Sequence, residues 1–383
     1  MANPVHAVLL LIVVVLLPLL FSLLLWDPIA VGRSAVKIKK SAELPLRFRY
    51  DGAFKILQVA DMHYGNGAMT RCRDVPSAET AGCSDLNTTQ FLWKLIHLEK
   101  PDLIAFTGDN IFGTSSTDAA ESLFQAFGPV VQYGKPWAAV LGNHDQESTM
   151  DRFELMSLIS LMDYSISQVN PFPASEKQQR IDGFGNYHIR VHGAFGSALA
   201  NTSVLNLYFL DSGDRAVVNG FKTYGWIKES QLTWMESTSQ KIQGSFQAPA
   251  LAFFHIAVPE VRQLWYSKIV GFFQEAVACS TVNSGVLKTL VSMGDVKAAF
   301  IGHDHLNDFC GKLDGIWFCY GGGFGYHAYG RANWPRRARV IFIELNKGIK
   351  EWLGVESIKT WKRIDDTKLS KIDELVLWKN GKE

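Results

Sequence analysis

From about residue 50 onward, short apolar runs alternate with longer amphipathic stretches. Five of the apolar runs are nearly unbroken and end in polar side chains, which is typical of strands buried on both faces of a parallel sheet. They are FKILQVAD (54–61), DLIAFTGD (102–109), PWAAVLGNHD (136–145), PALAFFH (249–255) and VKAAFIGHDH (296–305). The pattern therefore predicts a strand at each of these places.

The stretches between the early runs have the spacing of helices. We predict helices at 88–99, 117–133 and 151–163, the second opened by Thr117 as its cap. The later half is richer in strands, which the pattern predicts at 186–192, 204–210, 314–320 and 338–345, with a helix at 230–242. This order indicates an α/β fold that begins with a βαβαβ unit.

The N-terminus is the clearest break in composition. The run Ala7–Trp26 carries no charge, and its only polar side chain is Ser22. It is long enough to cross a bilayer, yet Pro18 interrupts it and Ala30 is suited to cleavage. A cleaved signal peptide is the favoured interpretation, and an uncleaved single-pass anchor is the alternative.

Two features bear on localisation and point in opposite directions. The basic cluster at 33–40 would keep the following domain cytosolic if the segment were an uncleaved anchor. The sequons at Asn87 and Asn201 favour a glycosylating lumen. We predict a secreted or luminal protein that touches a membrane only through its N-terminal segment, if that segment is uncleaved.

The chain divides by composition into four parts. We predict a signal peptide or anchor at 1–30, a linker at 31–50, a main α/β domain at 51–345 and a C-terminal extension that packs on it at 346–383. The 383 residues are 47% hydrophobic, which allows a large core. The formal net charge of +1 argues against nucleic-acid binding through phosphate neutralisation.

The five cysteines leave two interpretations open. Cys72 and Cys83 bracket a short polar loop, Cys310 and Cys319 bracket a hairpin, and Cys279 is left over. Each bracketed pair is able to form a disulfide in an oxidising compartment, whereas in a reducing one all five would be ordinary thiols.

Metal-binding residue types follow all five predicted strands. Ligands collect outside the carboxyl ends of strands in open α/β sheets, so these side chains are expected to face one crevice. They are Asp61, His63, Asp109, Asn143, His144, His255, His303 and His305. Imidazole and carboxylate donors without thiolate suit Fe, Zn or Mn, and their number implies two ions that share one carboxylate.

The pair in GHDH is ambiguous by itself. An HxH sequence is more often incidental than functional, although residues i and i+2 of a strand do point to the same side. By the same alternation, Asp304 is expected to point away from both histidines. Only the four other strand ends make His303 and His305 candidates for a metal site.

In this order, D-x-H, GD-x, GNH-[DE], a lone His and GH-x-H resemble the signature of calcineurin-like metallophosphoesterases, over residues 50–345. FFHIAVPE and CYGGGFGYHAYG look like the plant purple acid phosphatase-like subgroup, often labelled probable inactive. The resemblance implies a four-layer α/β/β/α sandwich. It also implies a first ion held by Asp61, His63, Asp109 and His305, and a second held by Asp109, Asn143, His255 and His303, bridged by Asp109 and a hydroxide.

The resemblance assigns further roles near the second ion. His144 would be catalytic, contacting the phosphoryl group or protonating the leaving oxygen, with Asn143 and His303 also binding substrate. We expect Asp145 to orient His144. Phe112 stands where purple acid phosphatases have a metal-binding tyrosine, so the tyrosine-to-iron bond is absent, and His63 supplies the ligand typical of the non-purple branch.

Two functions are consistent with these residues. The favoured one is an acid phosphatase-like enzyme that hydrolyses phosphate esters by attack of a metal-activated hydroxide. The alternative is a pseudoenzyme that keeps the fold as a secreted or membrane-tethered binding module. The complete set of ligand types favours the enzyme.

Overall fold

The computed structural model describes residues 39–171, 180–243, 247–349 and 351–381. The chain divides into the units Met1–Lys40 and Ser41–Glu383, and the second carries all the elements below. The apolar run at 7–26 and Ala30 lie outside the described residues. Within those residues, no helix is both long and apolar enough to cross a membrane.

The described residues form two large sheets, one of eight strands and one of six, and a separate hairpin. The larger sheet has the order β1 (Leu46–Arg47), β5 (Tyr187–His192), β6 (Ser203–Phe209), β9 (Ala250–Phe253), β11 (Val296–Ile301), β13 (Ile316–Tyr320), β12 (Cys310–Leu313) and β10 (Ile269–Val270). The smaller sheet has the order β16 (Lys371–Lys379), β15 (Trp352–Ile364), β14 (Arg337–Lys347), β2 (Ala53–Val59), β3 (Leu103–Thr107) and β4 (Trp137–Val140). The hairpin is β7 (Arg215–Val218) and β8 (Phe221–Tyr224).

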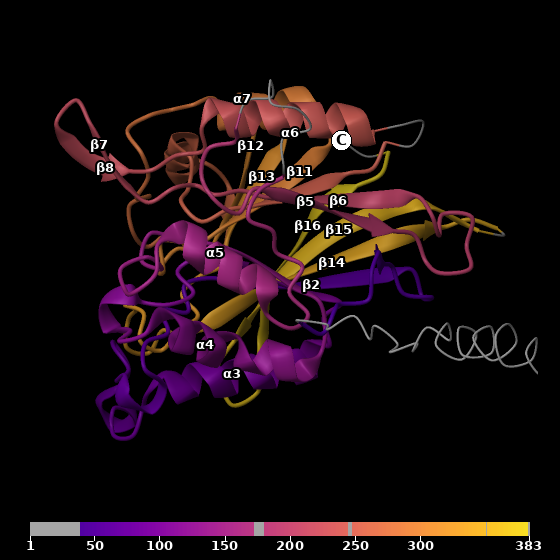
Figure 1. Ribbon diagram of the computed structural model, residues 1–383. Helices are drawn as coiled ribbons and strands as arrows, with labels where there is room; N and C mark the ends of the chain where they lie inside the picture. The colour runs from indigo at the N-terminus through magenta and orange to yellow at the C-terminus, as the bar shows by residue number, and fades with distance from the viewer. Residues whose placement is uncertain (1–38, 172–179, 244–246, 350, 382–383) are drawn as a thin grey trace, which may run out of the picture. The chain divides into compact units, whose positions relative to one another are not determined.

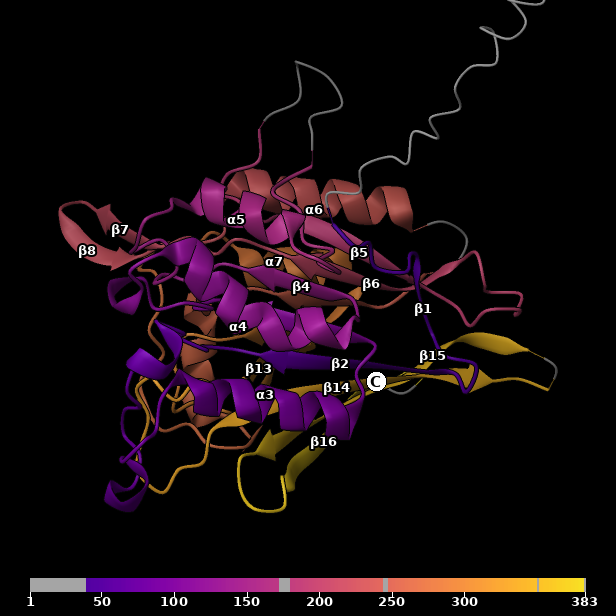
Figure 2. The ribbon, with the colours of Figure 1, turned by 60° about the horizontal axis from the view of Figure 1, so that its bottom comes forward.

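Helices cover the outer faces of both sheets. On the smaller sheet, α3 and α4 lie side by side with β2 visible between them, while α6 and α7 lie on the larger sheet (Figures 1 and 2). The helices are α3 (Asp85–Glu99), α4 (Ala119–Tyr133), α5 (Arg152–Leu161), α6 (Glu229–Ile242) and α7 (Val286–Met293). Short 3-10 helices lie at Gly67–Met69, Ser77–Glu79, Gly113–Ser115 and Pro259–Tyr266. The predicted α/β/β/α sandwich is confirmed.

The apolar runs are unbroken because the strands pack on both sides. In β9, Leu251 and Phe253 belong to one hydrophobic core, whereas Ala250 and Ala252 belong to a second core under α6 and α7. A strand in this position has no solvent face on which to place polar residues. The five predicted strands are accordingly β2, β3, β4, β9 and β11.

The other predicted elements are also present, with local differences. The strands β5, β6, β13 and β14 and the helices α3 to α6 match the predicted segments. The prediction that Thr117 caps α4 is wrong. The cap is Asp118, whose side chain accepts a hydrogen bond from Glu121 N in the first turn of the helix. The β7–β8 hairpin was not predicted, although Asn219 and Gly220 at its tip, both with positive φ, are the usual signal for such a turn.

The C-terminal region joins the smaller sheet. The strands β15 and β16 pair with β14 and with each other, so the predicted extension at 346–383 continues the sheet rather than lying on it. The buried Lys362 of β15 lies 2.7 Å from Asp308, which follows β11 of the larger sheet. This ion pair connects the two sheets. This region therefore supports the loop that carries two candidate ligands.

Both bracketed cysteine pairs form disulfides. Cys72 is joined to Cys83, and Cys310 of β12 is joined to Cys319 of β13. Cys279 is buried and unpaired. The disulfide interpretation is confirmed.

Candidate metal centre

The candidate ligands lie in the loops that follow the carboxyl ends of β2, β3, β4, β9 and β11. Because β2, β3 and β4 run parallel, as do β9 and β11, these loops emerge at the same edge of the two sheets. Gln58 of β2 also donates to Ile301 O of β11 at 3.1 Å, which fixes the two sheets against each other beside the loops. The structure thus brings the predicted residues together.

One buried cluster contains Asp61, His63, Asp109 and His305. One donor atom from each of these residues lies within 4.8 Å of the others. His63 Nε2 is 3.3 Å from Asp109 Oδ2 and 3.0 Å from His305 Nε2, and His305 Nε2 is 3.5 Å from Asp61 Oδ1. These four residues are the set expected to hold the first ion.

A second cluster contains Asp109, His255 and His303, again with donor atoms within 4.8 Å. His255 Nε2 lies 3.3 Å from Asp109 Oδ2 and 3.3 Å from Asn143 Oδ1, so the asparagine oxygen adjoins the cluster. Asp109 is common to both clusters. This is the position expected of a bridging carboxylate.

Two buried donor atoms favour a cation at this place. Asp109 Oδ2 and His303 Nε2 have no hydrogen-bond partner in the described part of the chain. A buried polar atom without a partner costs about 1–3 kcal/mol, so such atoms are rare unless an ion or water satisfies them. The nitrogen and carboxylate donors fit Fe, Zn or Mn.

Two of the four imidazole rings are held by backbone carbonyls on the side away from the clusters. His255 Nδ1 lies 2.8 Å from Thr107 O, and His305 Nδ1 lies 2.9 Å from Tyr329 O. With Nδ1 as the donor, Nε2 presents its lone pair to the cluster, which is how metal-binding histidines are usually oriented.

Four candidate ligands have strained backbone conformations. The φ angles are 58° at Asp61, 45° at His63, 48° at Asp109 and 80° at His303. Non-glycine residues with positive φ are uncommon, and such strain accumulates at functional sites. Gly142 allows the close packing, since a Cβ there would lie 2.1 Å from Asp109 Oδ1.

Burial and neighbouring charge shift the pKa values within the clusters. Burial tends to lower the pKa of His255, but Asp109 and Asp61 outweigh it and raise that pKa to about 9. Burial, together with the neighbouring His255, lowers the pKa of His303 to about 3. His303 is therefore neutral at pH 7, with its unpartnered nitrogen available to a cation.

The GHDH residues differ from a simple strand end. The strand β11 stops at Ile301, and the left-handed φ of His303 turns the chain, so the two histidines enter different clusters. The carboxylate of Asp304 accepts from Tyr320 OH at 2.6 Å and from Ala278 N at 3.1 Å. Asp304 belongs to neither cluster, although it lines the cavity beside them.

His144 has a carboxylate partner that the sequence did not suggest. Its Nδ1 lies 2.7 Å from Glu147 Oε2, and Arg215 of β7 pairs with Glu147 Oε1 at 2.6 Å. The expectation that Asp145 orients His144 is wrong. Asp145 instead accepts from the backbone N–H groups of Asn110, Ile111 and Gly142, and so fixes the loops of β3 and β4.

A cavity of about 270 Å³ opens onto both clusters. Phe112 lines it, with its ring centroid 5.1 Å from that of His63 and 4.8 Å from that of His144. The cavity is lined by His63, Arg73, Asp109, Phe112, His144, Tyr224, Ala278, His303, Asp304, His305 and Tyr329. The sequence did not single out five residues at or beside this cavity. They are Glu147 and Tyr329, which lie near or within quoted motifs, and Arg73, Arg215 and Tyr224, which do not.

The two sequons differ in their surroundings. Asn201 is exposed in the loop between β5 and β6. Asn87 is half-buried, and its side-chain oxygen accepts from Ser84 N at 3.1 Å in the capping box of α3. A glycan at Asn87 would compete with this cap, so Asn201 is the better acceptor.

Comparison with known proteins agrees with this geometry. Residues 54–307 match the calcineurin-like phosphoesterase family. The chain is 61% identical to a probable inactive purple acid phosphatase of Arabidopsis thaliana, and the match covers 98% of this chain and 96% of the relative. It is 34% identical to phosphatase DCR2 of Saccharomyces cerevisiae, and that match covers 82% of this chain and 54% of the relative. The fold resembles a dimetal phosphatase from Danio rerio, with a TM-score of 0.53 and 14% identity over 85% of this chain and 99% of that one.

Proposed function

Because the chain belongs to the calcineurin-like phosphoesterase family, we propose that it is a two-metal enzyme that hydrolyses phosphate esters. The observation that carries this proposal is Asp109, whose unpartnered Oδ2 lies between His63 and His255 and is common to both clusters. A single carboxylate in this position is suited to bridge two ions.

Each cluster would hold one ion. Asp61, His63, Asp109 and His305 would bind the first, and Asp109, Asn143, His255 and His303 the second. When bound, the ions would supply Lewis-acid activation of water and positive charge that stabilises the phosphate. Fe, Zn and Mn all suit these donors.

Side chains around the clusters would position the substrate and move its proton. His144 lines the cavity and is held through Nδ1 by Glu147, so its Nε2 would serve the leaving oxygen. The carboxylate of Glu147 fixes the orientation of the ring, as a general acid requires. Asn143 and His303 would contact the phosphoryl group from the second cluster.

The alternative is an inactive binding protein, which the name of the Arabidopsis relative suggests. That name is consistent with Phe112 at the position of the purple-enzyme tyrosine. The histidine at position 63 and the complete donor set support an active enzyme of the non-purple type instead, and the yeast relative is named a phosphatase.

An Asp109→Asn variant tests the proposal. Wild-type protein reconstituted with Mn, Zn or Fe should bind about two ions per chain and hydrolyse 4-nitrophenyl phosphate, whereas the variant should lose metal and activity together. Asp304→Asn is the matched control, because Asp304 lines the same cavity outside both clusters. Activity of the wild type no greater than that of Asp109→Asn with every metal would refute the enzyme.

We further propose that the protein is secreted or luminal. The two disulfides and the exposed sequon at Asn201 support an oxidising, glycosylating compartment. Loss of mass on glycosidase treatment and a mature N-terminus after residue 30 are expected. An intact N-terminus with the glycan present would indicate an uncleaved membrane anchor. Absence of a glycan would contradict a luminal domain, whether the N-terminal segment is cleaved or not.

A further inference from the structure

Among the described residues that line the cavity, Arg73 is the only lysine or arginine. Its side chain is exposed, and no carboxylate in the described part of the chain lies at salt-bridge distance from it. The cavity carboxylate of Asp304 accepts hydrogen bonds from Tyr320 and Ala278 instead. The guanidinium of Arg73 is therefore available to pair with an anionic group that enters the cavity.

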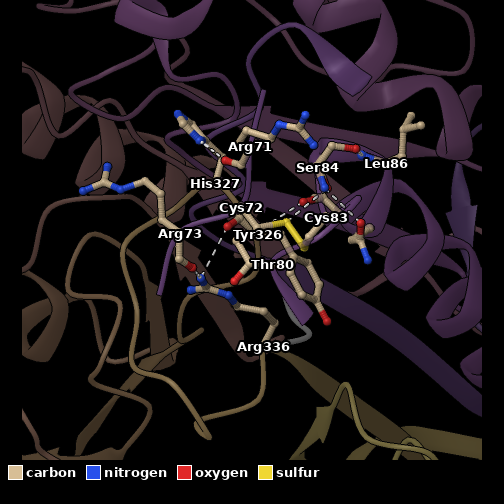
Figure 3. Close-up of a disulfide and its surroundings, with 12 residues drawn as sticks. Arg71, Cys72, Arg73, Thr80, Cys83, Ser84, Leu86, Tyr326, His327 and Arg336 are labelled. Carbon is tan, nitrogen blue, oxygen red and sulfur yellow. Dashed lines mark hydrogen bonds between the residues drawn. A yellow bond between two sulfur atoms is a disulfide. The ribbon is translucent and has the colours of Figure 1, made fainter. Parts of the chain in front are cut away.

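The backbone at Arg73 is fixed on both sides. The preceding residue, Cys72, is cross-linked to Cys83. Arg73 N donates to Tyr326 O at 2.9 Å, and Arg73 O accepts from Arg336 Nη2 at 2.8 Å (Figure 3). The exposed side chain thus starts from a rigid support, which lowers the entropy cost of binding through it.

The same support reaches the first metal cluster. The buried guanidinium of Arg336 also donates to Tyr329 O at 3.1 Å, and Tyr329 O lies 2.9 Å from His305 Nδ1. Asp74 adds a second tie, since its Oδ2 accepts from Gly330 N at 2.9 Å. The position of Arg73 is thereby set relative to the candidate ligand His305.

We propose that Arg73 binds a second phosphoryl group of the substrate, so that the preferred substrates are small bisphosphorylated molecules. This inference rests on the proposed function and names its substrate class. A guanidinium binds phosphate through paired hydrogen bonds, and a cavity of about 270 Å³ suits a sugar-sized molecule rather than a large one. One phosphoryl group would face the clusters and the other Arg73.

The substrates that test this proposal are fructose 1,6-bisphosphate and fructose 6-phosphate, given to the metal-loaded protein. We expect wild type to prefer the bisphosphate in kcat/KM, and Arg73→Ala to lower that preference about tenfold or more, mainly through KM. Arg73→Lys should recover part of the preference. An equal effect on both substrates, or no preference in the wild type, would overturn the proposal.

Arg71→Ala is the matched control. Arg71 flanks the same disulfide and is also exposed, but it does not line the cavity, and its side chain leaves the loop in a different direction from Arg73 (Figure 3). Its variant should keep the wild-type preference. Loss of preference in both variants would assign the effect to general surface charge and contradict the specific role of Arg73.

Binding separates this proposal from the enzyme itself. Calorimetric titration of metal-loaded His144→Ala, in which turnover is slow, measures affinity for the two sugars without hydrolysis. Failure of the wild type to hydrolyse any phosphate ester would refute the enzyme. The role of Arg73 would still stand if the bisphosphate binds more tightly than the monophosphate and Arg73→Ala, in the same background, removes that difference in affinity. Equal affinities for both sugars would refute that role.

Discussion

At the scale of single residues, the side chains that would bind metal differ from the one that would transfer a proton. Asp109 Oδ2 lies 3.3 Å from imidazole nitrogens on two sides, so its charge serves both clusters. His144 differs from the candidate ligands. The polar contacts of its ring are with Glu147 and Arg215 and not with the residues of the clusters. Metal binding and proton transfer should therefore be separable by mutation.

The variant His144→Ala tests this separation. Its backbone N–H, which donates to Asp109 Oδ1 at 2.8 Å, remains in the variant, so the bridging carboxylate keeps its support. We expect metal content to stay near two ions per chain while turnover of an alkyl phosphate, whose leaving oxygen needs a proton, falls about 100-fold or more. Metal analysis beside steady-state kinetics measures both, and loss of metal would show that His144 is a ligand.

The variant Glu147→Gln tests the orientation of His144. An amide forms a weaker hydrogen bond with His144 Nδ1 than a carboxylate does and holds the ring less firmly. Turnover of an alkyl phosphate, whose leaving group needs a proton, should therefore fall about tenfold or more. Turnover of 4-nitrophenyl phosphate, whose leaving group needs none, should change little. Equal loss with both substrates would indicate that Glu147 has only a structural role.

At the scale of elements, the site is built by loops that must approach one another closely. Gly325 donates to Asp61 O at 3.0 Å, which joins the loop after β13 to the loop after β2. A Cβ at Gly325 would lie 1.6 Å from Met62 O. Only glycine permits this contact between the two backbones.

The variant Gly325→Ala should separate the two loops. We expect a loss of about 1–3 kcal/mol in the free energy of unfolding, together with weaker metal binding. Gly128→Ala, in the helix α4 with no atom within 4 Å of its added Cβ, should instead be neutral or gain about 0.5–1 kcal/mol. Denaturant unfolding compares them, and similar stabilities for the two variants would contradict the close approach.

At the scale of the whole domain, a buried charge network connects the two sheets. Asp308, after β11, is bound by Arg337 of β14 and lies 2.7 Å from Lys362 of β15. Burial alone would raise the pKa of Asp308, but Lys362 and Arg337 outweigh it and hold that pKa below its ordinary value. The network ties the C-terminal strands to the loop that carries His303 and His305.

Stability should depend on pH through Asp308. Since its pKa is lower in the folded than in the unfolded protein, its contribution is fully present above the unfolded pKa of about 4 and is lost as pH falls through the folded pKa. Asp308→Asn should cost about 3–5 kcal/mol at pH 7, because the buried Arg337 loses its carboxylate partner and the buried Lys362 keeps only Asp373, 2.6 Å away. Urea unfolding from pH 7 to pH 3 should show the difference between the two proteins shrinking in acid. A constant difference would exclude this linkage.

The sequence by itself determined which residues form the strands and which side chains follow them. Unbroken apolar runs such as PALAFFH pack on both faces wherever they are placed, and the order of motifs identified the candidate ligands from Asp61 to His305. These predictions succeed because a strand's burial shows in its own residues, and because ligands collect at the carboxyl ends of strands in open α/β sheets.

Only the tertiary structure decided which side chains assist the ligands. Glu147, Arg215 and Arg73 reach the site from a turn, a hairpin and a disulfide loop, and no periodicity connects them with the metal motifs. Side chains meet there because two sheets bring distant loops to one edge, and distances of about 3 Å depend on that packing rather than on sequence spacing. For the same reason Asp145, next to His144 in the chain, supports the loops instead of the imidazole.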